Sequence, residues 1–119
     1  MRKKSASDLL KEANAQIRTI SVKDAKANAN KILFIDVREK HERETNLIID
    51  NSVLLSRGML EFYADKDGPY YNEVLNTDKK IVVFCTLGAR GALAVKTLQD
   101  MGYSNVYNLE NGLQDWKNQ

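Results

Sequence analysis

The only cysteine of the chain, Cys85, directly follows the densest β-branched run in the sequence, residues 81–84. Gly88 and Arg90 come next, at the spacing Cys-x-x-Gly-x-Arg. The β-branched run predicts a strand, and the apolar stripe over residues 90–101 predicts an amphipathic helix. Cys85 is therefore predicted to lie in a loop at the carboxyl end of a strand, where open α/β sheets hold their ligands.

This loop has the residue types needed to hold an anionic sulfur atom. Gly88 permits a positive φ, which lets several backbone N–H groups converge on one point. The following helix begins with unpaired N–H groups and the positive end of its dipole, and these groups favour the thiolate form of Cys85. A lone cysteine after an apolar strand can also be an unreactive small hydrophobe. The glycine loop closed by Arg90 favours the reactive interpretation.

The elements that must position this loop alternate between strands and helices. The apolar runs are continuous, which is typical of strands covered on both faces. The order predicts an α/β fold with a mainly parallel sheet. Ser7 is the predicted N-cap of the first helix. Strands are predicted over residues 20–22, 32–37, 53–55, 81–84 and 105–109, and helical segments over residues 5–17, 23–28, 58–64, 70–75, 90–101 and 112–117.

Charged residues follow the strand predicted over 32–37. Asp36 and Arg38 are predicted to form an ion pair, which either shapes the rim of the site or only supports the fold. The next charged stretch is interpreted as a solvated face, and it contains Glu39, His41, Glu42 and Glu44.

Length and composition exclude several classes of protein. The chain has 119 residues and a net charge of +2, which fits one domain and gives no dense basic face for nucleic acid. One cysteine and one histidine cannot supply a structural zinc site with four such ligands. No apolar run is long enough to cross a membrane, and no apolar segment follows the basic residues at the N-terminus. We therefore expect a cytoplasmic protein with no metal, membrane or nucleic-acid partner.

Four motifs in sequence order resemble the rhodanese homology domain, and together the likeness covers about residues 17–118. Asp36-Val-Arg-Glu39 is similar to the Asp-Val-Arg strand end, and Phe84-Cys-Thr-Leu-Gly-Ala-Arg90 to the active-site loop. The stretch 57–62, with Pro69 and Tyr70, resembles a single-domain bacterial subgroup. Leu109-Glu-Asn-Gly-Leu-Gln-Asp-Trp116 is similar to the closing Leu-x-Gly-Gly-x-x-x-Trp. The chain is thus divided into an N-terminal helical extension, residues 1–17, and a rhodanese-like domain, residues 18–119.

The resemblance implies a three-layer rhodanese-like fold, with helices on both faces of the sheet, and sulfurtransferase chemistry without a cofactor. Cys85 would take a sulfane sulfur from thiosulfate or a persulfide, hold it as a persulfide and pass it to a thiol or to cyanide. Arg90 would either recruit the anionic donor or hold the loop by bonding to backbone carbonyls. The loop that binds the substrate would consist of Thr86, Leu87, Gly88, Ala89 and Arg90, with Asp36 and Arg38 in support.

The sequence departs from the family pattern at three places. Residues 46–51 replace Gly-His-Ile-Pro-Gly-Ala, and their members Asn46, Asp50 and Asn51 tolerate positive φ better than most residues. Asn111 replaces a glycine, and Gly91 stands where the subgroup often has serine.

Two alternatives to a sulfurtransferase remain. The first is a related enzyme that acts on phosphoesters or arsenate. The phosphatases of that group have five residues between cysteine and arginine, whereas Cys85 and Arg90 are separated by four. The second alternative is a non-catalytic rhodanese-like module for protein contacts or regulation. Such modules often lack the cysteine.

Overall fold

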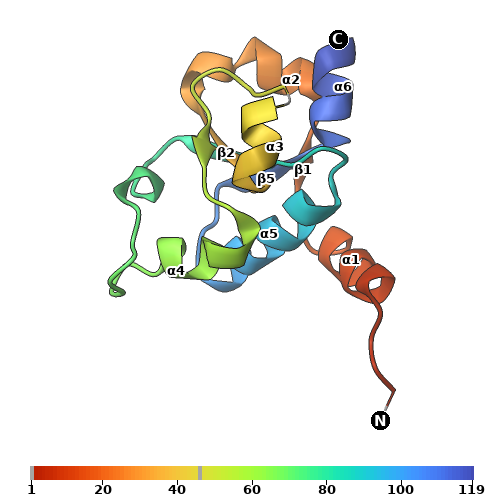
Figure 1. Ribbon diagram of the computed structural model, residues 1–119, viewed down its shortest axis with the longest axis vertical. Helices are drawn as coiled ribbons and strands as arrows, with labels where there is room; N and C mark the ends of the chain where they lie inside the picture. The colour runs from red at the N-terminus through yellow and green to blue at the C-terminus, as the bar shows by residue number, and fades with distance from the viewer. Residues whose placement is uncertain (1, 46) are drawn as a thin grey trace.

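The computed structural model describes residues 2–45 and 47–119, and their five strands form one sheet in the order β1-β5-β4-β2-β3 (Figure 1). Every pairing is parallel, as predicted. The central strand is β4, which pairs with β2 on one side and β5 on the other. Cys85 follows β4 directly. The strands are β1 (Thr19–Ile20), β2 (Ile32–Asp36), β3 (Val53–Leu54), β4 (Lys80–Phe84) and β5 (Val106–Leu109).

Helices cover both faces of the sheet and complete three layers (Figure 1). On one face lie α4 and α5, and on the other α2 and α6. Helix α1 packs against α5 on its outer side. None of the helices described is long and apolar enough to cross a membrane. Their bounds are α1 (Ala6–Asn14), α2 (Val22–Ala27), α3 (Lys40–Thr45), α4 (Leu60–Ala64), α5 (Ala89–Asp100) and α6 (Gly112–Asn118).

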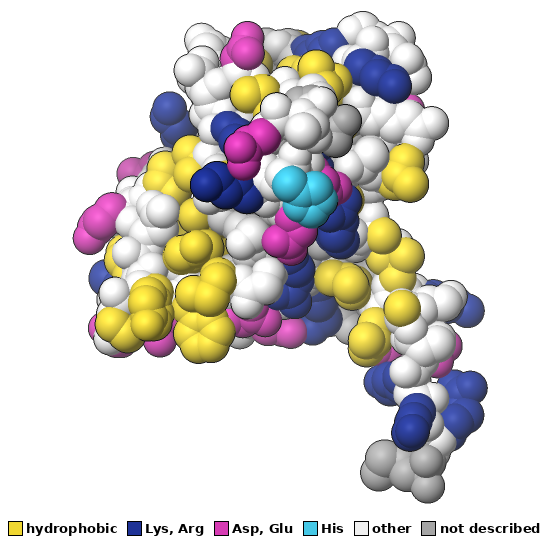
Figure 2. Space-filling model, in the orientation of Figure 1, with side chains coloured by type: hydrophobic (Ala, Val, Ile, Leu, Met, Phe, Trp, Pro, Cys, Tyr) yellow, Lys and Arg dark blue, Asp and Glu magenta, His cyan; other side chains and the backbone are white. Residues whose placement is uncertain are grey.

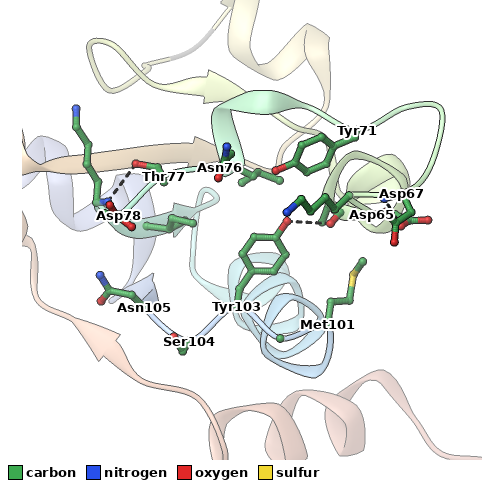
Figure 3. A pocket seen from close by; sticks show the side chains of 16 residues that line it. Asp65, Asp67, Tyr71, Asn76, Thr77, Asp78, Met101, Tyr103, Ser104 and Asn105 are labelled. Atoms are coloured by element: carbon green, nitrogen blue, oxygen red, sulfur yellow. Dashed lines mark hydrogen bonds between the residues drawn. The ribbon is translucent and has the colours of Figure 1, made fainter.

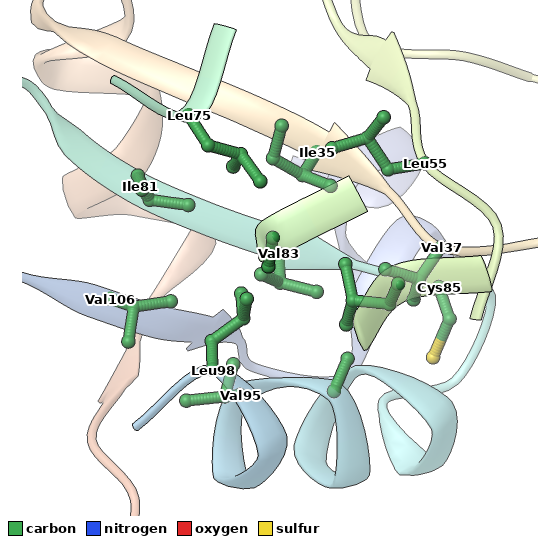
Figure 4. Close-up of a cluster of buried hydrophobic side chains, with 13 residues drawn as sticks. Ile35, Val37, Leu55, Leu75, Ile81, Val83, Cys85, Val95, Leu98 and Val106 are labelled. Atoms are coloured by element: carbon green, nitrogen blue, oxygen red, sulfur yellow. The ribbon is translucent and has the colours of Figure 1, made fainter. Parts of the chain in front are cut away.

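The two-residue period of the strands divides the core into two clusters. Ile35 and Val83 face α4 and α5, whereas Phe34 and Val82 face α2 and α6. All four side chains are buried, which explains why these strands read as continuous apolar runs. Cys85 lies at one end of the first cluster, close to the start of α5 (Figure 4). The thiol is therefore built into the α5 face of the sheet.

The N-terminal helix, predicted over residues 5–17, spans Ala6–Asn14 and so ends earlier than predicted. Its N-cap is Ser5, not Ser7. The Asp8 N–H donates to Ser5 Oγ, and the Ser5 N–H donates to an Asp8 carboxylate oxygen, each over 3.0 Å. This reciprocal capping box satisfies two N–H groups and fixes the start. The helix ends at Asn14, and Ala13 is its one buried residue among those described.

The prediction of a helix over residues 70–75 is wrong for its first half, residues 70–72. Only a 3₁₀ turn, Glu73–Leu75, forms there. The Asn72 N–H donates to the Tyr63 carbonyl, and the Asn72 side chain accepts from the Val74 N–H. These bonds tie the segment to the end of α4 and start the turn at Asn72. Two further 3₁₀ turns, Ala29–Lys31 and Arg57–Met59, join longer elements.

Candidate active site

Cys85 is almost fully buried, with 1% of its surface exposed, and its sulfur accepts two backbone hydrogen bonds. The Gly88 N–H lies 3.1 Å from Sγ and the Gly91 N–H lies 3.3 Å from it. Gly88 has φ 112°, as the predicted loop requires, and it is the N-cap of α5. The loop thus directs N–H dipoles at the sulfur, an arrangement that stabilises negative charge on it.

Helix α6 holds the carbonyl side of the same loop. The Leu113 N–H donates to the Cys85 carbonyl over 2.9 Å, and the Gln114 N–H donates to the Thr86 carbonyl over 3.1 Å. Gly112 makes this approach possible: a Cβ there would lie 2.3 Å from the Cys85 carbonyl oxygen, and its φ is 60°. With its carbonyls bound to α6, the loop keeps the N–H groups of its far end turned toward Cys85.

Two of the departures from the family pattern are occupied by asparagines in the left-handed region. Asn111 has φ 58° and Asn51 has φ 65°. They are the two non-glycine residues with positive φ in the described ranges 2–45 and 47–119, so Asp50 does not share this conformation. Asn46 lies outside the described residues. Asparagine therefore replaces glycine at position 111, and at position 51, opposite the alanine of the family pattern, it also takes a positive φ.

The predicted ion pair between Asp36 and Arg38 is present and buried. Arg38 Nε and Nη2 each donate to one oxygen of the Asp36 carboxylate over 3.0 Å. Arg43 Nη1 donates to the same carboxylate over 3.1 Å, and Arg38 also donates to the Leu47 carbonyl. This cluster connects the end of β2 to α3 and to the segment that follows α3.

Arg90 is held by a glutamate rather than by backbone carbonyls. Its Nη1 and Nη2 donate to the two carboxylate oxygens of Glu42 over 2.7 and 2.9 Å. The Arg90 guanidinium lowers the pKa of Glu42 from its ordinary value near 4.5 to about 2, and Glu42 in turn raises the pKa of Arg90. Thr86 Oγ1 is a weaker partner of Arg90, at 3.5 Å.

The interpretation of Glu42 as part of a solvated face is therefore wrong. Its side chain is only 20% exposed, because it turns inward to Arg90. Glu39 and Glu44 are exposed, as expected, and so is His41, the cyan side chain in Figure 2. Nothing in the charged run distinguished Glu42 from its neighbours, since its partner lies 48 residues away.

Asn108 is a second residue of the site that the sequence interpretation missed. It is 4% exposed, and its Nδ2 donates to the Gly88 carbonyl over 3.0 Å. Its Oδ1 is buried without a hydrogen-bond partner among the described residues. A Cβ at Gly91 would lie only 2.3 Å from that oxygen. The Asn108 amide thus occupies the space of a side chain at position 91, and an asparagine inside an apolar strand was the available signal.

A cavity of about 670 Å³ lies beside the loop. Thr86 and Leu87 border it on the loop side, and Leu87 is 64% exposed. The rest of its lining comes from the segment 38–47 and from α6, and consists of Arg38, Glu42, Leu47, Leu113, Gln114, Lys117 and Asn118. A ligand in this cavity would lie next to the residue that follows the cysteine.

Another cavity, of about 600 Å³, lies at the opposite end of the strands, where β4 and β5 begin (Figure 3). Tyr103 stands in it and donates its hydroxyl proton to the Ala64 carbonyl over 2.8 Å. Partial burial raises the pKa of this hydroxyl. No residue of the cysteine loop lines this cavity. The chemistry of Cys85 therefore takes place at the carboxyl ends of the strands, away from it.

Comparison with known proteins finds relatives that match most of this chain. A protein of unknown function from Rhodopseudomonas palustris CGA009, described as a possible tyrosine phosphatase, is 37% identical, with a TM-score of 0.91 over 99% of this chain and 92% of that one. A rhodanese-related protein from Thermoplasma volcanium is 31% identical, with a TM-score of 0.69 over 85% and 91% of the two chains.

Similarity also extends to a protein with a named activity. The thiosulfate sulfurtransferase GlpE of Pseudomonas syringae pv. syringae is 28% identical over 85 residues, which are 71% of this chain and 72% of that protein. The family profile named "Rhodanese-like domain" matches residues 21–119, from the start of α2 through the loop and α6. The chain belongs to the rhodanese-like domain family.

Proposed function

We propose that this protein is a sulfurtransferase that carries a sulfane sulfur as a persulfide on Cys85. The donor is thiosulfate or a persulfide, and the acceptor is a thiol or cyanide. The observation that supports this most directly is the pair of N–H groups, from Gly88 and Gly91, that donate to the buried sulfur. Sulfurtransferase chemistry is also what the named activity of the GlpE relative suggests.

The reaction needs a stabilised sulfur anion and no separate general base. The Cys85 thiolate attacks the sulfane sulfur of the donor, a new S–S bond forms, and the old S–S bond breaks to release sulfite or a thiolate. The negative charge then rests on the outer sulfur of the persulfide. An acceptor nucleophile attacks that sulfur and returns Cys85 as a thiolate. Fixed N–H dipoles suit both anions, because they need no reorganisation during transfer.

The described surroundings of Arg90 count against a phosphatase, the activity suggested for the Rhodopseudomonas palustris relative. A phosphoryl group needs several donors for its oxygens, and a guanidinium is a frequent one. Both Nη atoms of Arg90 are engaged by Glu42, and the loop has one residue fewer between cysteine and arginine than related phosphatases. A smaller loop favours a single sulfur atom over a tetrahedral oxyanion.

Intact mass measurement tests the proposal. After incubation with thiosulfate or a persulfide, the wild-type protein should gain one sulfur atom, and cyanide should remove it as thiocyanate. Cys85→Ser and Cys85→Ala should fold and gain none. Failure of every donor to load a protein whose thiol still reacts with iodoacetamide would favour a non-catalytic module. Hydrolysis of p-nitrophenyl phosphate that depends on Cys85 would favour the phosphatase.

A further inference from the structure

We propose that Glu42 is a specificity-determining residue: by holding Arg90, it disfavours dianionic donors, so that organic persulfides of low charge load Cys85 faster than thiosulfate. This inference rests on the proposed function, since it concerns how sulfur reaches Cys85. It gives a residue of α3 a part in loading sulfur onto Cys85 of the β4–α5 loop.

The first support is the state of the guanidinium groups around the loop. Arg90 gives both Nη atoms to the carboxylate of Glu42. Arg38 and Arg43 both donate to the buried carboxylate of Asp36. Each guanidinium that could meet an anionic donor at this end of the sheet is thus already paired with a carboxylate.

The second support is the charge of Glu42 itself. Its pKa of about 2 keeps it ionised near neutral pH, so protonation does not release Arg90. Thiosulfate carries two negative charges. To use Arg90, its sulfonate oxygens must displace the Glu42 carboxylate from a bidentate pair, and the displaced carboxylate then repels the donor. An organic persulfide has no sulfonate and does not need that exchange.

The third support is the cavity beside the loop. Its volume of about 670 Å³ is larger than an anion of five heavy atoms requires, and Leu47, Leu87 and Leu113 supply apolar lining. The carbon skeleton of a persulfide can lie there, next to Thr86, the residue that follows Cys85. In the transfer, the Cys85 thiolate forms a bond to the terminal sulfur of RS–S⁻, the RS–S bond breaks, and RS⁻ leaves, so that charge and sulfur balance.

The test compares Glu42→Gln with wild type on two donors, thiosulfate and the persulfide of 2-mercaptoethanol. The measurement is the initial rate at which the protein gains one sulfur atom, followed by intact mass. Glutamine keeps the size of the side chain and removes its charge. Loading from thiosulfate should rise about tenfold, the effect of one charge-assisted contact, while loading from the persulfide should change less than about threefold. The matched control is Glu44→Gln, an equal change of charge at an exposed position of α3.

Four outcomes would overturn the inference. If Glu42→Gln accelerates loading equally with both donors, the effect is a general one of charge. The same conclusion follows if Glu44→Gln accelerates loading from thiosulfate as much as Glu42→Gln does. Slower loading from thiosulfate in Glu42→Gln would mean that Glu42 positions Arg90 to assist the donor. If no donor loads wild type or either variant, the proposed function fails as well, and that result is recognised because Cys85 then gains no sulfur under any condition.

Discussion

At the scale of single residues, Asp36 is the most constrained charge described. It has no exposed surface and accepts hydrogen bonds from two guanidinium groups and from the Arg38 N–H. Removing one member of a buried ion pair costs far more than an exposed pair contributes, because the remaining charge is left without compensation.

We therefore expect Asp36→Ala to lower the free energy of unfolding by about 3–5 kcal/mol, measured by urea denaturation. The cause is the buried Arg38, which would lose its carboxylate partner. Asp50→Ala, at an exposed position, is the control and should change the free energy by less than about 0.5 kcal/mol. If Asp36→Ala lowers the free energy of unfolding by less than about 1 kcal/mol, the variant does not leave Arg38 as a buried charge without a partner.

The pair of Glu42 and Arg90 predicts a pH dependence of stability. The pKa of Glu42 is lower in the folded protein than in the unfolded chain, so the pair stabilises fully above about pH 4.5, and this stabilisation is lost as the pH falls toward 2. Near neutral pH, the free energy of unfolding of wild type should exceed that of Glu42→Gln by about 1 kcal/mol. This value is the upper end of the range for a partly exposed ion pair. Urea denaturation at several pH values checks this. A difference that persists unchanged down to about pH 2 would be inconsistent with titration of Glu42.

At the scale of elements, the contact between α5 and β5 next to Cys85 depends on complementary side chains. Gly91 leaves room for the amide of Asn108. We expect Gly91→Ser to lower stability by about 1–3 kcal/mol, because the new Cβ meets the Asn108 oxygen. Asn108→Ala should relieve this collision, so the double variant should lose less stability than the two single changes together. Thermal melts of wild type, the two single variants and the double variant measure the coupling between positions 91 and 108. Strictly additive losses of stability would rule out the contact between them.

The strands and the cysteine loop could be predicted because their signals are local. A continuous apolar run predicts β2 and a dense β-branched run predicts β4, and glycine and arginine at fixed spacing predict the loop after Cys85. Residue pairs distant in the sequence could not be predicted this way. The bond from Arg90 to Glu42 spans 48 residues, and the bond from Asn108 to Gly88 spans 20. Both pairings are products of the folded sheet, so the identity of each residue alone did not reveal them.

At the scale of the whole molecule, α1 adds a helix outside the three layers (Figure 1). It contributes no strand, it packs against α5, and Ala13 is its one buried residue among those described. We propose that residues 18–119 form the rhodanese-like domain and that residues 1–17 are an extension of it. Ile17, at the boundary, still packs against the core.

A chain without residues 1–14 should therefore fold and gain sulfur on Cys85, with a melting temperature about 5 °C lower than the full chain, equivalent to about 1 kcal/mol. Ala13→Asp in the full chain should lower the melting temperature to a similar extent, because it places a charge at the buried position of α1. A shortened chain that does not fold would mean that α1 is an integral part of the domain.

The bonds from α6 to the cysteine loop have an optical consequence. Trp116, the only tryptophan of the chain, lies in α6 with its ring edge-on to Phe34, at 5.5 Å between centroids, and with Lys26 Nζ 4.9 Å from its ring. The first turn of the same helix holds the carbonyls of Cys85 and Thr86. We therefore expect a change in the loop on gaining sulfur to reach the indole about one helical turn away. Its intrinsic fluorescence should then provide a label-free signal for the state of the nucleophile.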